Sequence, residues 1–270
     1  MIEALAESEN STNFREAIVD VAGYPTFVRR AGSGRPLVFL HGAFFPTAWL
    51  PLYDLLAEKA EVIAPLHPGY REGGPPDWLR GFDDLVLHYH DFVDALSLDR
   101  IDLVGYDLGG WAAAQFARFY PERVRSLTLI AASGLLVPDA PPFEFLAASA
   151  DRVRNALFNG DPPASYPAPD PADIDGFVEG YGENGVTARL IWERRYDPRL
   201  DRRASQLRMP CLVIAASEDR IVPAAHARRW SQLLVASRTV MLENCGHGLP
   251  VQCAAEIASA IQSFLAEVPS

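Results

Sequence analysis

Residues 104–111, VGYDLGGW, decide the fold of this chain. They lie between an apolar run, IDLV, and an alanine-rich stretch, AAAQFARF, and this order predicts a buried strand, a tight turn and a helix. Gly105 and Gly109 flank Asp107 at two residues on either side, where a Cβ atom would crowd the turn. The sequence therefore predicts an elbow of strained backbone from which the carboxylate of Asp107 projects.

On both sides of this turn, short apolar runs alternate with stretches of helical spacing. Buried strands are predicted in RPLVFLHG and AEVIAPLHPGY, further strands in MPCLVIAASEDRIVP and RTVML, and helices in segments between and after them. Strands that alternate with helices predict a parallel sheet joined by right-handed crossovers. The alternating pattern of residues 14–34 predicts a hairpin before these strands, and residues 1–13 are expected to form a loose terminal segment.

The alternation stops in the middle of the chain. Residues 134–207 are rich in Pro, Asp, Ala and aromatic residues, and they show no strand pattern. The stretch ENGVTARLIWERRYD has helical spacing, so we interpret this segment as a mostly helical insertion with proline-rich connections. The predicted organisation is an α/β core in residues 1–133, a helical cap in residues 134–207 and the rest of the core in residues 208–270.

The composition is that of one α/β domain with an insertion. The chain has 270 residues, 49% of them hydrophobic, and no run of eighteen apolar residues that would cross a membrane. The formal charge of −11, without a basic cluster, argues against nucleic acids and anionic membranes as partners. The acidic, polar N-terminus lacks the pattern of a signal peptide, so a cytoplasmic location is expected. Cys211, Cys245 and Cys253 match neither a disulfide framework nor a zinc site, and reduced, mostly buried thiols are expected.

Four motifs in the expected order make the chain resemble the α/β-hydrolase fold superfamily over nearly its whole length. They are FLHG after an early strand, the elbow GYDLGG, ASEDRIVP after a late strand, and CGHGLP near the C-terminus. The resemblance implies an α/β fold with a mostly parallel eight-stranded sheet flanked by helices and carrying a helical cap. It also implies a catalytic triad in the order nucleophile, acid and histidine, which here are Asp107, Asp219 and His247.

The same resemblance implies an oxyanion hole next to Asp107. Its N–H donors are expected on Leu108, which follows the elbow, and on Ala43, which follows the HG pair, with Phe44 as the alternative to Ala43. His41 is expected to order this loop rather than to react. No metal and no cofactor are expected, and the predicted partner is a small-molecule substrate, acted on by a monomer or a homodimer.

Asp107 stands where a serine is expected in this superfamily, and the difference changes the chemistry. A carboxylate is already anionic at neutral pH, and its attack on an sp³ carbon gives an alkyl ester that water activated by His247 can hydrolyse. The triad thus resembles that of the branches with an aspartate nucleophile, the epoxide hydrolases and the haloalkane or haloacid dehalogenases. An epoxide is the favoured substrate, in an apolar pocket to which Phe44 and Trp192 contribute.

The cap is expected to supply the other groups that these reactions need. Ring opening of an epoxide requires a proton donor, for which the family uses cap tyrosines, and Tyr196 is the first candidate and Tyr166 the second. A departing halide would need N–H donors from side chains. Leu108 and Ala43 occupy the family's donor positions and are apolar, which leaves Trp192 as the candidate and counts against dehalogenation.

Two other functions stay open at this point. The segment from WERRYDPRL to ASEDRIVP and the elbow helix GGWAAAQFA resemble serine-type α/β hydrolases, including esterases and hydrolases of carbon–carbon bonds. A chain of that lineage could use Asp107 as a general base, in lyase or cyclase chemistry, or as part of a ligand-binding site without turnover.

Overall fold

A nine-stranded sheet forms the centre of the molecule. The computed structural model describes residues 2–4, 13–166, 170 and 172–269. Along the sheet the strand order is β1-β2-β3-β5-β4-β6-β7-β8-β9. The strands are β1 (Ile2–Ala4), β2 (Arg15–Val21), β3 (Tyr24–Gly32), β4 (Pro36–Leu40), β5 (Glu61–Pro65), β6 (Ile101–Tyr106), β7 (Val124–Ile130), β8 (Cys211–Ala216) and β9 (Ser237–Leu242).

The strands from β4 to β9 pair in parallel, and β1, β2 and β3 pair antiparallel at one edge. The eight strands β2 to β9 confirm the predicted mostly parallel sheet, and β2 and β3 form the predicted hairpin. The prediction of a loose segment at residues 1–13 was wrong for Ile2–Ala4, which adds a ninth strand by pairing with β2. The other part of that prediction, residues 5–12, lies outside the described residues.

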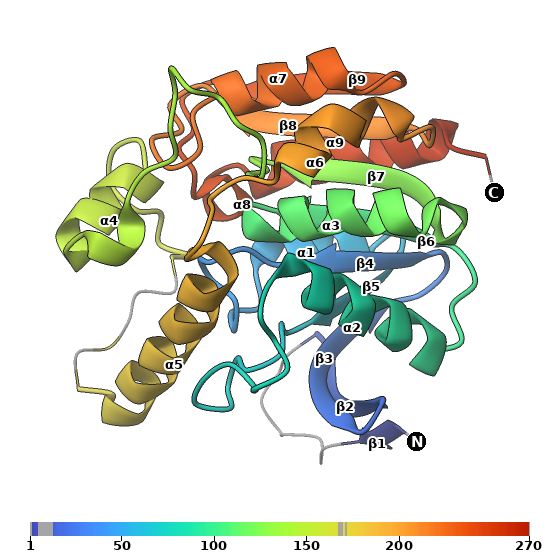
Figure 1. The fold of residues 1–270 in the computed structure, drawn as a ribbon, viewed down its shortest axis with the longest axis horizontal. Helices are drawn as coiled ribbons and strands as arrows, with labels where there is room; N and C mark the ends of the chain where they lie inside the picture. Colours follow the sequence, from blue (N-terminus) through green and yellow to red (C-terminus); the bar gives the residue numbers. More distant parts are fainter. Residues whose placement is uncertain (1, 5–12, 167–169, 171, 270) are drawn as a thin grey trace.

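Helices cover both faces of the sheet, as Figure 1 shows. Apolar side chains of α1 and α9 pack on one face, and those of α2, α3 and α7 pack on the other. Strand β6 is buried along its whole length because it lies in the middle of the sheet between these two layers. These helices are α1 (Pro51–Ala57), α2 (Phe82–Ala95), α3 (Leu108–Phe119), α7 (Ala225–Leu233) and α9 (Ala254–Glu267).

The segment expected to form the cap carries helices α4 (Ala150–Leu157), α5 (Ile174–Ile191) and α6 (Pro198–Arg203). In Figure 1, α4 and α5 lie beyond one end of the sheet. The helix expected around ENGVTARLIWERRYD begins earlier and ends earlier than its sequence pattern indicated, because α5 stops at Ile191. The chain then forms a bridge between Gly134 and Tyr196 and starts α6, whose first backbone N–H groups are capped by the Asp197 side chain.

The structure corrects one expectation about the cysteines. Cys211 is buried and free, but the sulfur atoms of Cys245 and Cys253 lie within bonding distance of each other. Their Cα atoms are 6.8 Å apart because the short helix α8 (Leu249–Gln252) turns the chain back on itself between them. The sequence spacing of eight residues could not reveal this turn, and reduced thiols were therefore the wrong expectation for this pair.

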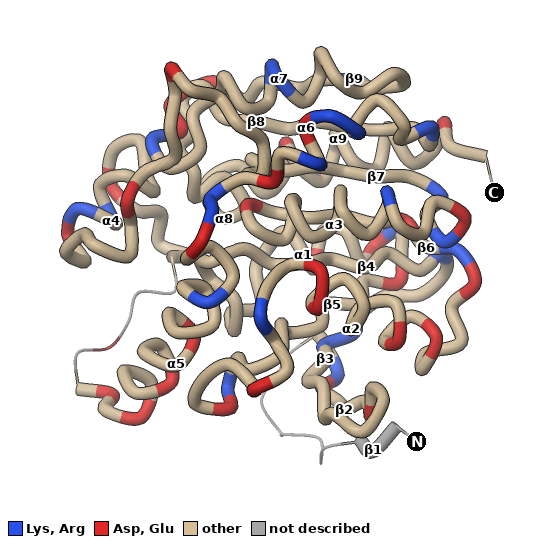
Figure 2. The backbone as a smooth tube through the Cα atoms, viewed as in Figure 1, with Lys and Arg blue, Asp and Glu red and all other residues tan. Residues whose placement is uncertain are grey.

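Residues of both charges, coloured blue and red on the backbone tube of Figure 2, are spread along the chain. This distribution agrees with the absence of a basic cluster in the sequence. Among the helices of the described residues, none combines the length and the apolar composition needed to cross a membrane.

Candidate active site

The site is built on the elbow between β6 and α3. Asp107 has φ of 53° and ψ of −117°, a backbone conformation that residues other than glycine rarely adopt. Its side chain forms no hydrogen bond that caps α3, although it occupies the N-cap position. The carboxylate is therefore turned away from the helix and free to face the other catalytic groups, as the sequence pattern predicts.

Two glycines make this elbow possible because backbone atoms approach them closely. A Cβ atom on Gly105 would lie 2.3 Å from the carbonyl oxygen of Gly109. A Cβ atom on Gly109 would lie 2.1 Å from the carbonyl oxygen of Leu40, at the end of β4. The neighbours in both cases are backbone atoms that cannot move aside, so the turn accepts only glycine at these positions.

The structure brings Asp107, Asp219 and His247 together from three separate loops. The loop after β8 carries Asp219, and the loop after β9 carries His247. The Nδ1 atom of His247 is 2.8 Å from Oδ2 of Asp219, and its Nε2 atom is 3.9 Å from Oδ1 of Asp107. All three residues are buried.

The Asp219 carboxylate is fixed on both sides. Its Oδ1 atom accepts hydrogen bonds from the backbone N–H groups of Ile221 at 2.9 Å and Val222 at 2.8 Å. Its Oδ2 atom remains for the ring of His247. Because Asp219 accepts at Nδ1, the proton of a neutral imidazole lies there and Nε2 faces Asp107 as a base.

One oxygen of Asp107 occupies the expected oxyanion hole. The backbone N–H of Ala43 donates to Oδ2 of Asp107 at 3.0 Å, and Oδ1 is the oxygen that faces His247. Gly42 permits this approach, since a Cβ atom there would lie 2.6 Å from Cβ of Asp107. The two carboxylate oxygens therefore have different environments, one held by a backbone donor and one turned toward the imidazole.

Two stacked histidines hold the loop that carries Ala43. The rings of His41 and His67 lie 3.8 Å apart, and the backbone N–H of His67 donates to Nε2 of His41 at 2.9 Å. Burial lowers the pKa of His41 to about 4 and that of His67 well below its usual value, so both rings are neutral at pH 7. His41 thus orders the loop as predicted, and His67 is a second ordering residue that sequence reasoning missed.

Burial and charge act in opposite directions on the reacting pair. Burial raises the pKa of Asp107, while the nearby His247 and the N–H groups of Ala43 and Leu108 lower it, and the net shift is upward. Burial lowers the pKa of His247, but the charge of Asp219, its hydrogen bond and the charge of Asp107 together raise it above the usual value. The form with ionised Asp107 and neutral His247 is therefore populated at pH values above the raised pKa values of both groups.

We expect the pKa of His247 to fall in the Asp107→Asn variant, because the substitution removes one of the charges that raise it. A pH titration of the His247 ring signals by NMR measures this directly. The exposed Glu58→Gln serves as the control and leaves the pKa of His247 unchanged. An unchanged or higher pKa in Asp107→Asn would show that the two side chains do not interact in solution.

The raised pKa of His247 also determines how the stability of the fold depends on pH. A histidine whose pKa is raised in the folded state stabilises the fold fully below its unfolded pKa of about 6.5, and loses that contribution as the pH rises through the folded value.

Aromatic side chains line the reacting groups on the side of the cap. The ring of Phe44 lies 5.5 Å from that of His247, and it also contacts Phe145 at 5.1 Å. Tyr166 packs on Phe158 at 4.9 Å, and Phe158 in turn lies against Gly248, the neighbour of His247. Of the predicted cap residues, Tyr166 is therefore separated from the triad loop by a single aromatic layer.

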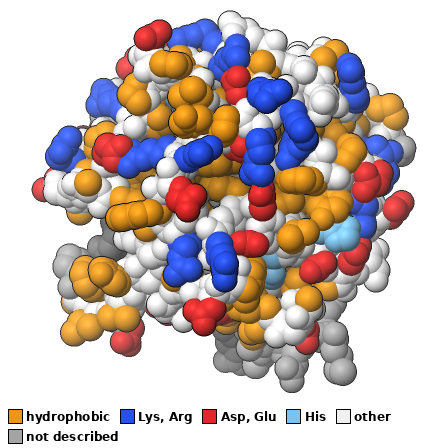
Figure 3. Space-filling view, in the orientation of Figure 1, with side chains coloured by type: hydrophobic (Ala, Val, Ile, Leu, Met, Phe, Trp, Pro, Cys, Tyr) orange, Lys and Arg blue, Asp and Glu red, His pale blue; other side chains and the backbone are white. Residues whose placement is uncertain are grey.

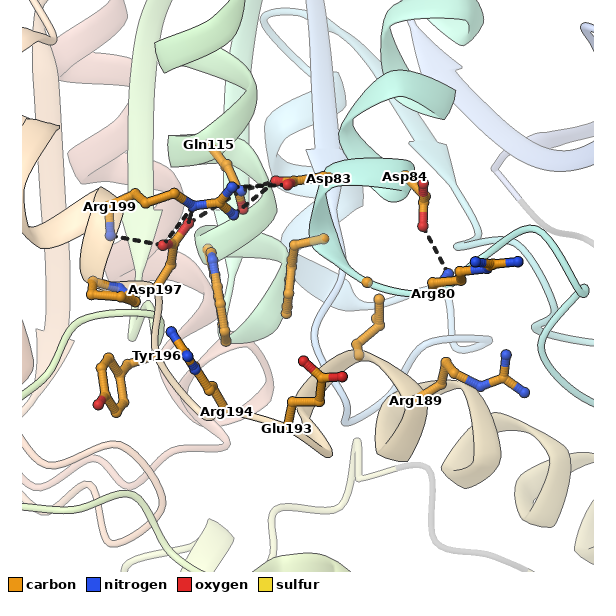
Figure 4. Close-up of a pocket in the computed structure, with 15 residues that line it drawn as sticks. Arg80, Asp83, Asp84, Gln115, Arg189, Glu193, Arg194, Tyr196, Asp197 and Arg199 are labelled. Carbon is orange, nitrogen blue, oxygen red and sulfur yellow. Dashed lines mark hydrogen bonds and ion pairs between the residues drawn. The ribbon is translucent and has the colours of Figure 1, made fainter.

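The structure places Tyr196 and Trp192 elsewhere. Trp192 is 82% exposed, and both residues line a surface pocket of about 570 Å³. Tyr196 also borders a second pocket, of about 500 Å³, where Figure 4 shows Arg199 between Asp83 and Asp197. No residue of the triad lines either pocket. The prediction that both side chains face the substrate conflicts with this placement, because α5 ends at Ile191 and the chain turns away before α6.

Tyr70 is a polar group near the carboxylate that sequence reasoning did not single out. It is buried, its ring lies 4.7 Å from that of His41, and its hydroxyl is 2.8 Å from Oγ1 of Thr187 on α5. Burial raises the pKa of Tyr70, and the negative charges of Glu183 and Asp107 add to the shift. The signal in the sequence was its position in the loop LHPGY after β5, but only packing shows that this loop meets α5 above the elbow.

Metal ligands would have to come from grouped His, Cys, Asp or Glu side chains. Among the residues that the structure describes, no three of them are arranged so that they could hold a metal ion.

The comparisons with known proteins agree with this fold. The model of the alpha/beta hydrolase family matches residues 37–260. The 2-hydroxymuconate semialdehyde hydrolase of Pseudomonas sp. (strain CF600) is 30% identical over 280 residues, which cover 96% of each chain. The 2-hydroxy-6-oxo-6-(2'-aminophenyl)hexa-2,4-dienoic acid hydrolase of Metapseudomonas resinovorans is 26% identical and covers 97% of this chain and 94% of its own.

A solved structure of a serine hydrolase involved in carbazole degradation has the same fold, with a TM-score of 0.75. It is 24% identical and covers 94% of this chain and 99% of its own. That protein is described as a serine hydrolase, whereas this chain carries Asp107 at the elbow. The match of the family model over most of the sequence, together with the fold, shows that the chain belongs to the α/β-hydrolase family.

Proposed function

We propose that the protein hydrolyses a small organic molecule at an sp³ carbon, through an alkyl ester on Asp107, and that an epoxide is the preferred substrate. The observation that carries this proposal is the asymmetric environment of the Asp107 carboxylate. Oδ2 accepts the Ala43 N–H at 3.0 Å, and Oδ1 lies 3.9 Å from Nε2 of His247. This is the arrangement that an ester on Oδ1, with its carbonyl oxygen in the oxyanion hole, would need.

In the first step, Oδ1 of Asp107 attacks one carbon of the epoxide, the C–O bond breaks, and the ring oxygen takes a proton from a nearby donor. In the second step, Nε2 of His247 removes a proton from water, which attacks the carbonyl carbon of the ester. The oxyanion that forms is Oδ2, already held by Ala43. As the intermediate collapses, the bond between the carbonyl carbon and Oδ1 breaks, and Nε2 of His247 gives its proton to Oδ1, which leaves with the diol. The carboxylate keeps Oδ2 and the oxygen of the water, and the second proton of the water restores the donor of the first step. Until it gives up its proton, the charged ring of His247 is stabilised by Asp219.

The same contact weighs against acyl transfer. In a serine hydrolase the oxyanion hole receives the carbonyl oxygen of the substrate. Here the Ala43 N–H is taken by the Asp107 side chain itself, so a substrate carbonyl would have to displace a charged acceptor. Attack of a carboxylate on an acyl carbon would also give an anhydride, which offers little advantage over the starting ester.

The surroundings of Asp107 favour a neutral, apolar substrate over one that carries a carboxylate or releases a halide. The side-chain charges that shift the pKa of Asp107 belong to His247 and Asp219, and neither is a guanidinium or ammonium group that would pair with a substrate carboxylate. Phe44 adds an apolar wall beside His247. A leaving halide lacks a donor because Leu108 and Ala43 have apolar side chains and Trp192 is 82% exposed.

A second candidate is suggested by the relatives, whose names describe hydrolases of 2-hydroxy-6-oxo-dienoic acids and 2-hydroxymuconate semialdehyde. In this alternative, Asp107 would act as a general base toward water or substrate in carbon–carbon bond cleavage, without a covalent intermediate. Oδ1 of the carboxylate lies 3.9 Å from Nε2 of His247, too far for a direct hydrogen bond, and Oδ2 would still block the Ala43 donor.

We expect Tyr166→Phe and Tyr70→Phe each to lower kcat for an epoxide by about 100-fold if the residue donates the proton, because general acids contribute at least that factor. Tyr196→Phe is the matched control and changes kcat less than about twofold, since Tyr196 lies in the surface pockets. The measurement is kcat and KM on two aryl epoxides, one with an electron-withdrawing ring. Loss of a true proton donor lowers kcat less for the epoxide with the electron-withdrawing ring. A packing defect lowers kcat equally for both epoxides.

A single turnover in ¹⁸O-labelled water tests the proposed function. A panel of aryl and alkyl epoxides, haloalkanes, activated esters and dienoic ketone acids first identifies a substrate. With enzyme in excess, the ester route puts the label into the peptide that contains Asp107 and leaves the product unlabelled. Label in the product and none in Asp107 would instead support the general-base alternative.

A further inference from the structure

The outward face of cap helix α5 is apolar, which is unusual for a helix on the surface. Five large apolar side chains of this face are exposed to between 59% and 82%: Ile174, Phe177, Val178, Tyr181 and Trp192. In Figure 3, hydrophobic side chains gather over this part of the molecule, at the end where α5 projects. The opposite face packs on the core through Val186, Thr187, Leu190 and Ile191. A helix that is apolar on both faces normally has a partner on each.

The spacing of the outward residues is that of a coiled coil. Steps of four and three residues alternate along this face, and every residue reached in this way is apolar or small. We call this row of residues the stripe. Its last residue, Trp192, follows α5 directly and still has helical backbone angles. The stripe consists of Ile174, Val178, Tyr181, Gly185, Ala188 and Trp192. Large residues stand in its first half, and the small Gly185 and Ala188 separate them from Trp192 at its end. A parallel pair would set these small residues opposite each other and leave a gap, so the stripe is not self-complementary in that direction.

We propose that this stripe is the interface of a homodimer in which α5 pairs antiparallel with α5 of a second copy. A two-fold axis at the middle of the stripe sets Tyr181 opposite Gly185 of the other copy, and Val178 opposite Ala188. Tyr181 and Val178 then each meet a small residue, and Ile174 lies opposite Trp192, so the two ends of the interface bury two large apolar side chains each. The inference concerns assembly and does not depend on the reaction proposed for Asp107.

The charged residues of α5 also favour an antiparallel pair of helices. Within the helix, acidic residues stand in the first half, at Asp175 and Glu179, and the basic Arg189 stands in the last turn. After the helix end, Arg194 and Arg195 follow Glu193, so this end carries an excess of basic residues. In Figure 2, red dominates the first half of α5, and blue lies in its last turn. An antiparallel pair brings the acidic half of one helix beside the basic end of the other, whereas a parallel pair aligns like charges.

A lipid surface is the competing occupant, and the charges disfavour it. The first half of α5, which carries most of the exposed apolar side chains, is acidic, and the chain has a net charge of −11. Both would be repelled by an anionic bilayer. The helix has 18 residues and is about 27 Å long, so one helix pair makes an interface at the small end of the range and a dimer that dissociates at micromolar concentrations.

Sedimentation velocity over about 1–100 μM protein tests the dimer. We expect the wild type to shift from monomer to dimer, and Gly185→Leu to raise the dissociation constant by about 30-fold, as loss of an interface hot spot does. The matched control is Gly180→Leu, on the same exposed helix but off the stripe. A Cβ atom there meets nothing within 4 Å, and one on Gly185 meets only Pro75 at 3.7 Å, so both variants keep the monomer fold.

A cross-linking experiment tests the direction of the helices. Under mild oxidation, a mixture of Tyr181→Cys and Gly185→Cys chains should give more linked dimer than either variant alone. Preferential linking of Tyr181→Cys to itself would overturn the antiparallel arrangement. A wild type that stays monomeric at about 100 μM would overturn the dimer, and flotation of that monomer with phosphatidylcholine vesicles, lost in Tyr181→Lys, would assign the stripe to lipid instead.

Discussion

Asp107→Ser is expected to lose epoxide hydrolysis by about 10⁴-fold or more and to gain hydrolysis of an activated ester such as p-nitrophenyl acetate. The loss follows because a serine hydroxyl is a poor nucleophile toward an sp³ carbon. The gain follows because the shorter side chain releases the Ala43 N–H, which Oδ2 of Asp107 now occupies at 3.0 Å. Initial rates on both substrates, measured side by side, give the two fold-changes.

Asp107→Asn is the matched control for this exchange. Its amide is neither a nucleophile for the epoxide nor a group that frees the oxyanion hole, so it is expected to be inactive on both substrates. Both variants remove a buried carboxylate whose pKa is raised by its burial, and neither should unfold the chain. A folded Asp107→Ser that still opens epoxides at the wild-type rate would contradict the nucleophilic role of Asp107.

His247→Gln is expected to stop the reaction after its first half. The carboxylate of Asp107 still attacks the epoxide, but no base remains within reach of the ester to activate water, so the alkyl-enzyme accumulates. We expect one equivalent of substrate to react in a burst, followed by turnover at about 10⁻³ of the wild-type rate or less. Intact-protein mass spectrometry should show the added mass of one substrate, and peptide mapping should place it on Asp107.

The double variant Asp107→Asn/His247→Gln is the control for this trapping experiment, and it should carry no adduct. If His247→Gln gains no mass while the wild type turns over, water is activated without a covalent intermediate. The general-base alternative for Asp107 then becomes the better account. An adduct on any residue other than Asp107 would argue against the elbow as the site of attack.

The elbow and the triad could be predicted from the sequence because local chemistry determines them. Gly105 and Gly109 mark a turn that is too tight for a side chain at either position, and the short motifs around Asp219 and His247 each follow a strand. Parallel strands bring their carboxyl ends to the same edge of a sheet, so loops that are distant in sequence meet there. The fold and the meeting of these three side chains follow from that rule.

The cap could not be predicted at the same level. The sequence made Tyr196 the first candidate for the proton donor and Tyr166 the second. The end of α5 at Ile191 instead turns Tyr196 toward the surface pockets, while Tyr166 packs on Phe158. Trp192 looked like a pocket residue and is exposed. Side-chain direction in such a segment depends on where its helices end and what they pack on, and neither is encoded in a local pattern.

The sequence by itself determined the parallel sheet, the carboxylate at the elbow and the order of the catalytic groups, since these depend on backbone geometry that few residues permit. The tertiary structure alone decided that Oδ2 of Asp107 accepts the N–H of Ala43, that the hydroxyl of Tyr70 meets Thr187 of α5, and that Cys245 meets Cys253. Each of these contacts joins segments whose approach is set by the packing of whole elements, which no local pattern of residues encodes.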